Sequence, residues 1–158
     1  MLYYSNSTMQ LVQNKKATHN YDILKKYEAG IQLQGWEVKS LRQKHGSLKE
    51  AYLKAKNQKG KTELFLHNAH IPLYQPQQGR EEDPYRDRKI LLHRKEIQTL
   101  EEALKQKGLT LIPLRIYLKG NLMKLEIALA RGKKLHDKRA DMKKRTAQRE
   151  AERVMKRF

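Results

Sequence analysis

The segment LTLIPLRIYLKGNLMKLEIALA, residues 109–130, carries the clearest structural pattern in this chain of 158 residues. In its second half, apolar residues occupy every second position: Met123, Leu125, Ile127 and Leu129. A period of two places these side chains on one face of a β-strand and the charged side chains between them on the other. Gly120-Asn121 separates the two halves and is typical of a tight turn. The segment therefore predicts an antiparallel hairpin with strands at 109–119 and 122–130.

Weaker patterns outside this hairpin predict further strands and two helices. Residues 52–56 and 62–71 are predicted to be strands, and residues 89–93 form a further short apolar run. Residues 36–42 and 97–104 show a helical period. Residues 21–33 also alternate, with a break at 28–30 that includes Gly30. About six short, mostly antiparallel strands with flanking helices predict a mainly β fold, a small antiparallel barrel of the oligonucleotide-binding (OB) type.

The charge of the chain indicates a polyanionic partner. The sequence contains 35 Lys and Arg against 17 Asp and Glu, a net charge of +18, and no cysteine. Self-repulsion on this scale destabilises a compact chain unless a polyanion neutralises it. No apolar run approaches the roughly 20 residues that span a bilayer, and residues 1–5 are too short and too polar for a signal peptide. We therefore expect a cytoplasmic protein that binds nucleic acid and no membrane; a basic surface without a specific partner is the alternative.

The distribution of charge predicts three regions. Residues 1–13 have no clear period and are expected to be a disordered lead-in, whereas residues 14–130 are expected to form the barrel. From Arg131 to Phe158 the chain has twelve basic and four acidic residues, a net charge of +8. This segment, the basic tail, has too few apolar residues to fold alone but is rich in good helix formers. We expect it to be disordered when free and helical when bound to a polyanion.

No group of residues in the sequence is typical of an active site. His67 and His70 form an H-x-x-H pattern, but on a strand their rings would point to opposite faces, which is poor geometry for a metal site. Glu81-Glu82-Asp83 resembles the carboxylates of a two-metal nuclease, yet it lies in a long polar loop, 72–87, where a solvated acidic run is the ordinary alternative. We expect no metal, no cofactor and no enzymatic activity, and keep a metal-dependent nuclease that uses Asp83 as an alternative.

Basic and aromatic residues instead indicate where RNA would bind. Arg86, Arg88 and Lys89 lie beside Tyr85, and four more basic residues stand earlier in the chain: Lys15, Lys16, Lys39 and Arg42. Guanidinium groups bind phosphates, and aromatic rings stack on unpaired bases. A solvated charged face is the alternative for most of the lysines. Glu28 would repel phosphate but can accept a hydrogen bond from a base edge or a ribose hydroxyl; an ordinary surface carboxylate is the alternative.

Several longer motifs occur in a fixed order along the chain: NKKA (14–17), YEAGI (27–31), GWEVKSLR (35–42), NAHI (68–71), DPYRDRKILLH (83–93), ARGKK (130–134) and HDKR (136–139). In order and spacing they resemble the SsrA-binding protein family, also called small protein B, of bacterial trans-translation. The resemblance covers residues 14–158. Only residues 1–13 fall outside it, so that Met1 and Met9 both remain candidates for the first residue.

The resemblance implies a fold, partners and a mechanism. The family fold is an OB-type barrel with flanking helices. Family members bind the tRNA-like domain of transfer-messenger RNA (tmRNA) and accompany its alanyl form, with elongation factor Tu, into ribosomes stalled without a complete codon. The tail becomes a helix in the empty mRNA channel and reaches the decoding centre of the small subunit and its ribosomal RNA. The family is not enzymatic, and we expect a monomer.

The resemblance also assigns roles to residues. Glu28, Leu91 and His93 would belong to the surface that meets tmRNA, although the position of His93 is not always His in the family. Four residues would begin the tail and approach the decoding centre: Gly132, Lys133, Lys134 and His136, the last by stacking on a ribosomal RNA base. Asp137, Lys138 and Arg139 match the tail motif required for accommodation. From composition alone, a constitutive ribosomal protein with a basic extension remains the alternative.

Overall fold

The computed structural model describes residues 7–74 and 81–157. Within these ranges, seven strands and four helices follow one another: β1 Thr8–Gln13, α1 Ala17–Asn20, β2 Tyr21–Ile31, α2 Gly35–Arg42, β3 Tyr52–Gln58, β4 Lys61–His67, β5 Arg88–Leu91, α3 Arg94–Leu104, β6 Leu109–Lys119, β7 Leu122–Gly132 and α4 Leu135–Met155.

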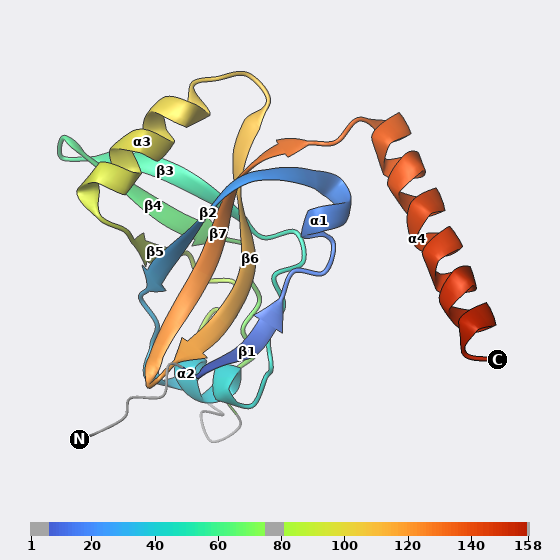
Figure 1. Ribbon diagram of the computed structural model, residues 1–158. Helices are drawn as coiled ribbons and strands as arrows, with labels where there is room; N and C mark the ends of the chain where they lie inside the picture. The colour runs from blue at the N-terminus through green and yellow to red at the C-terminus, as the bar shows by residue number, and fades with distance from the viewer. Residues whose placement is uncertain (1–6, 75–80, 158) are drawn as a thin grey trace, which may run out of the picture.

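The strands form one antiparallel sheet in the order β1-β6-β7-β2-β5-β4-β3. The sheet curls so that β3, at one edge, comes close to β6, which lies next to the other edge. In Figure 1 the curled sheet resembles an open barrel, with α3 near one end, α2 near the other, and α1 at the side from which α4 leaves. The predicted mainly antiparallel β fold with flanking helices is confirmed, with seven strands rather than about six.

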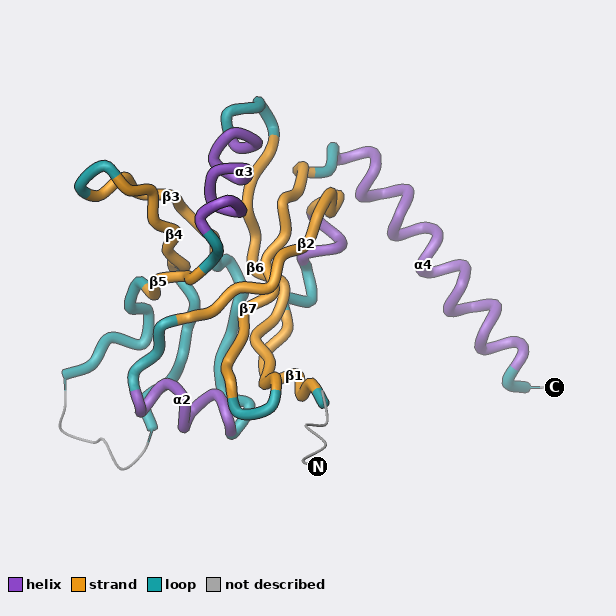
Figure 2. Tube along the Cα trace, turned by 60° about the vertical axis from the view of Figure 1, so that its left-hand side comes forward, coloured by secondary structure: helices purple, strands orange, loops and turns teal. Residues whose placement is uncertain are grey.

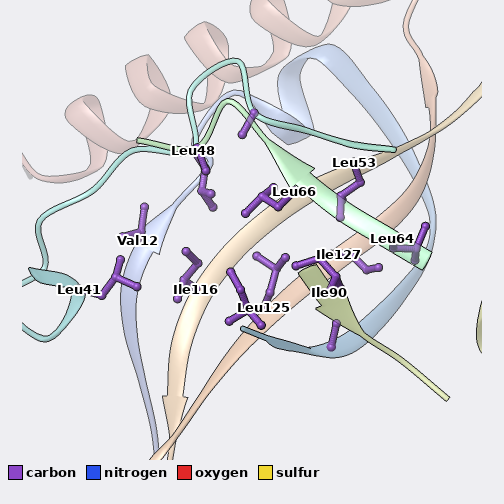
Figure 3. Packing of buried hydrophobic residues seen from close by; sticks show 14 of the residues in the cluster. Val12, Leu41, Leu48, Leu53, Leu64, Leu66, Ile90, Ile116, Leu125 and Ile127 are labelled. Carbon is purple, nitrogen blue, oxygen red and sulfur yellow. The ribbon is translucent and has the colours of Figure 1, made fainter. Parts of the chain in front are cut away.

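The predicted hairpin of residues 109–130 is the centre of the sheet. Lys119 pairs with Leu122, and Gly120 in the turn between them has a φ of 60°, a value that glycine adopts without strain. Leu125 and Ile127 are completely buried, as their period of two predicts. Figure 3 shows them meeting side chains of the opposite wall of the barrel: Leu53, Leu64, Leu66 and Ile90. The hairpin therefore supplies one wall of the main core.

Two β-bulges, one on each side of β7, reverse the faces of the neighbouring strands. The register with β7 shifts between Ile23 and Lys25 in β2 and between Pro113 and Arg115 in β6. A bulge inserts one extra residue, so the inward and outward positions exchange beyond it. In β6, Leu114 belongs to a small cluster beside α1, whereas Ile116 belongs to the main core. The polar residues that follow this bulge consequently face outward.

The outer face of β2, β7 and β6 is divided by these bulges into an apolar half and a polar half. The apolar half is a cluster that joins α1 to the sheet: Ala17, Ile112, Leu114, Ala128 and Ala130. The polar half is not covered by a helix in Figure 1 and carries the outward residues of the three strands: Lys26, Glu28, Arg115, Tyr117, Lys119, Lys124 and Glu126. An uncovered polar sheet face next to a packed core is a surface on which a polar ligand can lie.

Two sequence predictions about the first third of the chain need correction, and one short helix was not predicted. Residues 8–13, part of the predicted disordered lead-in, form β1, because Leu11 and Val12 are buried in the core while the backbone pairs with β6. Residues 1–6 lie outside the described residues. β2 runs through the predicted break at 28–30 because Gly30 pairs on both sides, with Lys124 and Leu91. The short helix α1 has only four residues, too few to give a period.

The basic tail contains α4, which extends away from the barrel (Figure 2). The helix agrees with the helix-forming composition of the segment. It is present in the chain alone, whereas the sequence argument expects helix only after a polyanion binds. Beyond its first turns the side chains of α4 are exposed, including Met142, Val154 and Met155. Since little packing supports this helix, disorder of the free tail in solution stays a prediction.

Candidate nucleic-acid interface

Glu28 lies at the centre of the polar half of the sheet face. The Tyr117 hydroxyl donates a hydrogen bond to its Oε2, and Lys119 Nζ lies 3.1 Å from its Oε1. The hydrogen bond from Tyr117 and, after it, the nearby ammonium of Lys119 lower the pKa of the Glu28 carboxyl below its ordinary value. The side chain is still 42 % exposed. Glu28 is thus an ionised, oriented carboxylate that remains accessible to a ligand.

Leu91 lies beside Glu28 in the sheet. Gly30, two residues after Glu28, pairs with Leu91, and a Cβ at Gly30 would lie 3.2 Å from the Cβ of Leu91. Leu91, the last residue of β5, is 46 % exposed and offers an apolar side chain on this face. His93 follows as the N-cap of α3; its backbone N–H donates to Glu96 at 3.2 Å and its side chain is exposed. The structure therefore brings Glu28 and Leu91 together, with His93 close along the chain. We call Glu28, Leu91, Tyr117 and Lys119 the strand surface.

Arg88 is not available to RNA, and the prediction that it binds RNA is wrong. Its side chain is 0 % exposed and forms an ion pair with the equally buried Glu37 of α2. Its Nη1 and Nη2 donate to the carbonyl oxygens of Ala69 at 2.6 Å and Pro84 at 3.0 Å. A buried guanidinium needs such partners for all its donors, so Arg88 joins α2, β5 and the chain before β5 into one unit.

The two basic neighbours of Arg88 are partly neutralised. Arg86, half-buried, forms an ion pair with the same Glu37, and Lys89 Nζ lies 2.7 Å from Glu63 Oε1 of β4. Tyr85, which the sequence places beside them, is exposed, and the centre of its ring lies 4.9 Å from the centre of the His70 ring. A role of Arg86 and Lys89 in RNA binding stays a prediction, because either could exchange its carboxylate partner for a phosphate.

Lys15 and Lys16 lie on a different side of the barrel, in the turn between β1 and α1. Both are exposed, and both line a groove of about 620 Å³ between α1 and the segment that precedes β3. Lys49 and Glu50 line the opposite side of the groove, which has three cations and one carboxylate in its walls. Such a groove suits an extended phosphate backbone, and Lys49 is a member of it that sequence reasoning missed.

Lys39 and Arg42 occupy a third position, on the exposed side of α2. Lys39 Nζ lies 5.4 Å from the centre of the Tyr74 ring, a cation–π contact. In Figure 1 α2 is at the end of the barrel away from α3 and α1. The predicted basic residues of the barrel therefore do not form one patch: Lys15 and Lys16 lie beside α1, whereas Lys39 and Arg42 lie on α2, to which Arg86 is joined through Glu37.

The root of the tail is fixed to α1 and β2. Gly132 ends β7, and the Lys133 backbone N–H donates to Asn20 O at 2.9 Å. The Lys133 ammonium contacts Thr18 O at 3.0 Å, Asp22 Oδ1 at 4.0 Å and, by a hydrogen bond, Asp141 of α4. Its side chain is only 10 % exposed. Lys133 thus fixes the start of α4, and a direct contact of this residue with ribosomal RNA would require these bonds to break.

The other predicted tail residues lie in the first turns of α4. Lys134 is the exposed N-cap, Asp137 and Lys138 are half-buried, and Arg139 is exposed. His136 belongs to the helix, but its side chain lies outside the described part of the structure. Asp141 of α4 accepts a hydrogen bond from the Lys133 ammonium, and this bond lowers the pKa of the Asp141 carboxyl. The predicted tail motif therefore starts close to α1, near Lys15 and Lys16.

The partners of Glu28 are the functional residues that the sequence did not reveal. Tyr117 and Lys119 share its face only because of the bulge at Pro113–Arg115, which a regular period of two would not include. The single available signal is the proline, since within sheets proline favours edges and bulges. Tyr117 is assigned to the outer face by the hydrogen bond to Glu28.

Asp83 and His67, two of the residues considered for metal binding, are engaged in other contacts. Asp83 Oδ1 accepts a hydrogen bond from the Tyr85 N–H at 2.8 Å, and His67 Nδ1 lies 2.7 Å from Asp87 Oδ1. Within residues 7–74 and 81–157 there is no group of three or more His, Asp or Glu side chains that could hold a metal ion. In the same part of the chain, no helix is long and apolar enough to cross a membrane.

Comparison with known proteins identifies the family. The sequence model of the SmpB protein family matches residues 11–157, almost the whole chain. The chain belongs to the SmpB family. An SsrA-binding protein of Dehalococcoides mccartyi is 51% identical over 92% of this chain and 83% of its own length. Those of Geobacillus kaustophilus and Burkholderia vietnamiensis are 49% and 48% identical, over 92% and 94% of this chain and 92% and 98% of their own.

A solved structure supports the same assignment for the fold. A chain of the structure headed "tmRNA-SmpB: a journey to the center of the bacterial ribosome" superposes with a TM-score of 0.63. It is 44% identical in sequence, and the match covers 78% of this SmpB-family chain and 84% of that one. The resemblance stated from the sequence motifs is thereby confirmed for the family and for its fold.

Proposed function

We propose that this SmpB-family protein is an RNA-binding adaptor that binds tmRNA and delivers it to stalled ribosomes in trans-translation. Relatives that are about half identical over most of the chain are SsrA-binding proteins, and SsrA RNA is tmRNA. The observation that carries the proposal is the separation of two surfaces: the strand surface around Glu28 at one end of β2 and β7, and the cationic helix α4, which follows the other end of these paired strands and extends away from the barrel (Figure 1). An adaptor needs two such surfaces, one for each RNA partner.

The strand surface would bind the tRNA-like domain of tmRNA. Glu28 is an acceptor for base or ribose donors, Leu91 offers an apolar contact, and Lys119 supplies a cation beside them. Exposed His93 would extend this surface. Lys15, Lys16, Lys39 and Arg42, together with the part-neutralised Arg86 and Lys89, would add phosphate contacts that position the RNA rather than select it.

The tail would enter the empty mRNA channel and report that message is absent. Its net charge of +8 over 28 residues draws it into a channel walled by phosphates through counterion release. When message fills the channel, α4 has no room there, so selectivity comes from exclusion. Gly132, Lys133 and Lys134 would begin this segment, and His136, Asp137, Lys138 and Arg139 would reach the decoding centre. Elongation factor Tu would take part indirectly, with alanyl-tmRNA.

The proposal includes a cytoplasmic, monomeric protein without enzymatic activity. It is tested by purifying the tagged protein from cells and identifying the bound RNA, together with its stoichiometry on ribosomes. We expect tmRNA as the dominant RNA and far less than one copy per ribosome. One copy per ribosome with bulk ribosomal RNA would instead establish a structural ribosomal protein. Cleavage of RNA that requires Mg²⁺ and is lost in Asp83→Asn would contradict the assignment as a non-enzyme.

A further inference from the structure

The hydrogen bond between Tyr117 and Glu28 gives Tyr117 a role in RNA recognition. We propose that Tyr117 is a positioning residue, whose buried hydroxyl holds the Glu28 carboxylate in the orientation in which it accepts a hydrogen bond from RNA. The inference rests on the proposed function, because it requires that Glu28 contacts RNA. Tyr117 itself would make no contact with RNA, since it is only 3% exposed.

The ring of Tyr117 is held by a chain of charged side chains on the same sheet face. The guanidinium of Arg115 lies over it, with Cζ 4.5 Å from the ring centre. Arg115 Nη2 is in turn 3.2 Å from Glu126 Oε2, and Lys26 Nζ is 3.9 Å from Glu126 Oε1. Each member lies on a neighbouring strand of β6, β7 and β2. The hydroxyl is therefore fixed relative to β2, the strand that carries Glu28.

The two partners of Glu28 differ in how readily they can give way to a ligand. Tyr117 is buried and binds Oε2, whereas Lys119 binds Oε1 from a side chain that is 44% exposed. A long exposed lysine moves easily and its ion pair is screened by salt. An arriving RNA group would thus compete with, or join, Lys119 at Oε1, where a carboxylate oxygen has room for two donors. Tyr117 keeps Oε2 occupied and the carboxylate plane fixed.

The protonation states of the pair determine what Glu28 can bind. Burial, and then the neighbouring Glu28 carboxylate, raise the pKa of the Tyr117 hydroxyl, which keeps its proton and donates it. The same hydrogen bond, with Lys119, lowers the pKa of Glu28, which stays ionised and can only accept. The RNA group at this position is therefore a donor, a base amino or imino group or a ribose 2′-hydroxyl, and not a phosphate.

The test compares Tyr117→Phe with Tyr27→Phe in binding to the isolated tRNA-like domain of tmRNA. Tyr117→Phe removes only the hydroxyl, and the dissociation constant should rise about three- to tenfold, the range that corresponds to one hydrogen bond of ordinary net strength. Tyr27 is next to Glu28 in β2 but belongs to the main core, on the opposite face of the sheet from Glu28, so Tyr27→Phe should bind as the wild type does. Thermal melting of each variant establishes that the barrel is intact.

A double-mutant cycle with Glu28→Ala separates positioning from a general structural role. If Tyr117 acts through Glu28, Tyr117→Phe costs nothing further once Glu28 is alanine; an equal loss in both backgrounds overturns the inference. An unaltered affinity of Tyr117→Phe, together with a weakened Glu28→Ala, overturns the inference and leaves the proposed function standing. An unaltered affinity of Glu28→Ala overturns the inference and the assignment of Glu28 to the RNA-binding surface, whereas the co-purified RNA tests the proposed function separately. Without RNA, carboxyl NMR should show the pKa of Glu28 rising toward its ordinary value in Tyr117→Phe; no change would also overturn the inference.

Discussion

The barrel and the tail carry similar total charge but arrange it in opposite ways. The net charge is +10 over residues 1–130 and +8 over the last 28. In the barrel, many basic groups have acidic partners at fixed places, such as Lys89 with Glu63 and Lys119 with Glu28. In α4, the side chains that follow Asp141 are exposed, and the helix contacts little of the barrel. The barrel can therefore recognise a shape and a donor group, whereas the tail responds to the presence of a phosphate-lined space.

The largest expected effect comes from removing one region while keeping the other. Deletion of residues 138–158 should abolish tagging of stalled peptides in a reconstituted translation system, because the segment that fills the mRNA channel is lost. The affinity for tmRNA should change little, since the strand surface is intact. The measurement is tagging rate beside equilibrium binding of the same variant. Tagging at the normal rate by the truncated protein would contradict the division of function.

The next largest effect is expected from Arg88, which tests whether the fixed ion pairs of the barrel stabilise its fold. Arg88→Met should destabilise the protein by about 3–5 kcal/mol, because it leaves the buried carboxylate of Glu37 with Arg86 as its remaining ion-pair partner. For a domain of this size, the melting temperature should fall by roughly 2–4 °C for each kcal/mol of lost unfolding free energy. Lys39→Met, at an exposed site on α2, is the matched control and should melt as the wild type does. Equal melting temperatures of the two variants would show that the buried ion cluster does not stabilise the barrel.

The difference between predicted and observed sites has physical causes that Arg88 and Tyr117 illustrate. The hairpin at 109–130 was predictable because a buried face imposes a strict period of two on Leu125 and Ile127. Arg88 was misassigned because sequence shows charge but not burial, and the partner that buries it, Glu37, lies 51 residues away. Tyr117 was missed because the bulge at Pro113–Arg115 reverses the face of the strand. Local pattern therefore gave the strands, and long-range pairing decided which polar residues reach the surface.

The salt dependence of RNA binding should also distinguish the barrel from the tail. For single-stranded poly(U), each phosphate contact contributes about −0.7 to the slope of log K against log salt. Deleting residues 138–158 removes nine basic residues and should flatten this slope by several units. Glu28→Gln should leave the slope for poly(U) unchanged, since Glu28 makes no phosphate contact. An equal slope for the wild type and the truncated protein would mean that the tail does not bind phosphates.

Order in the tail is a smaller effect that can be measured on the tail alone. A peptide of residues 131–158 should show little helix by circular dichroism in dilute buffer, because an isolated helix is marginal without a packing face. Addition of poly(U) should increase the helical signal. High helicity in buffer alone would contradict folding on binding and would mean that the tail enters the channel already as α4.

The smallest expected effect concerns the bond that joins the two regions, between Lys133 and Asp141. Lys133 holds the pKa of Asp141 below its ordinary value of 3.8, so the bond stabilises the docked tail fully above pH 3.8 and is lost as the pH falls through the lowered pKa. Nuclear spin relaxation of residues 133–141 should show the root of α4 loosening below about pH 3.8. Asp141→Asn should already be looser at pH 6 and show no such step, whereas Glu150→Gln, farther along α4, should behave as the wild type. A step of unchanged size in Asp141→Asn would mean that other carboxyl groups dock the tail, and that the barrel does not fix its direction through Lys133.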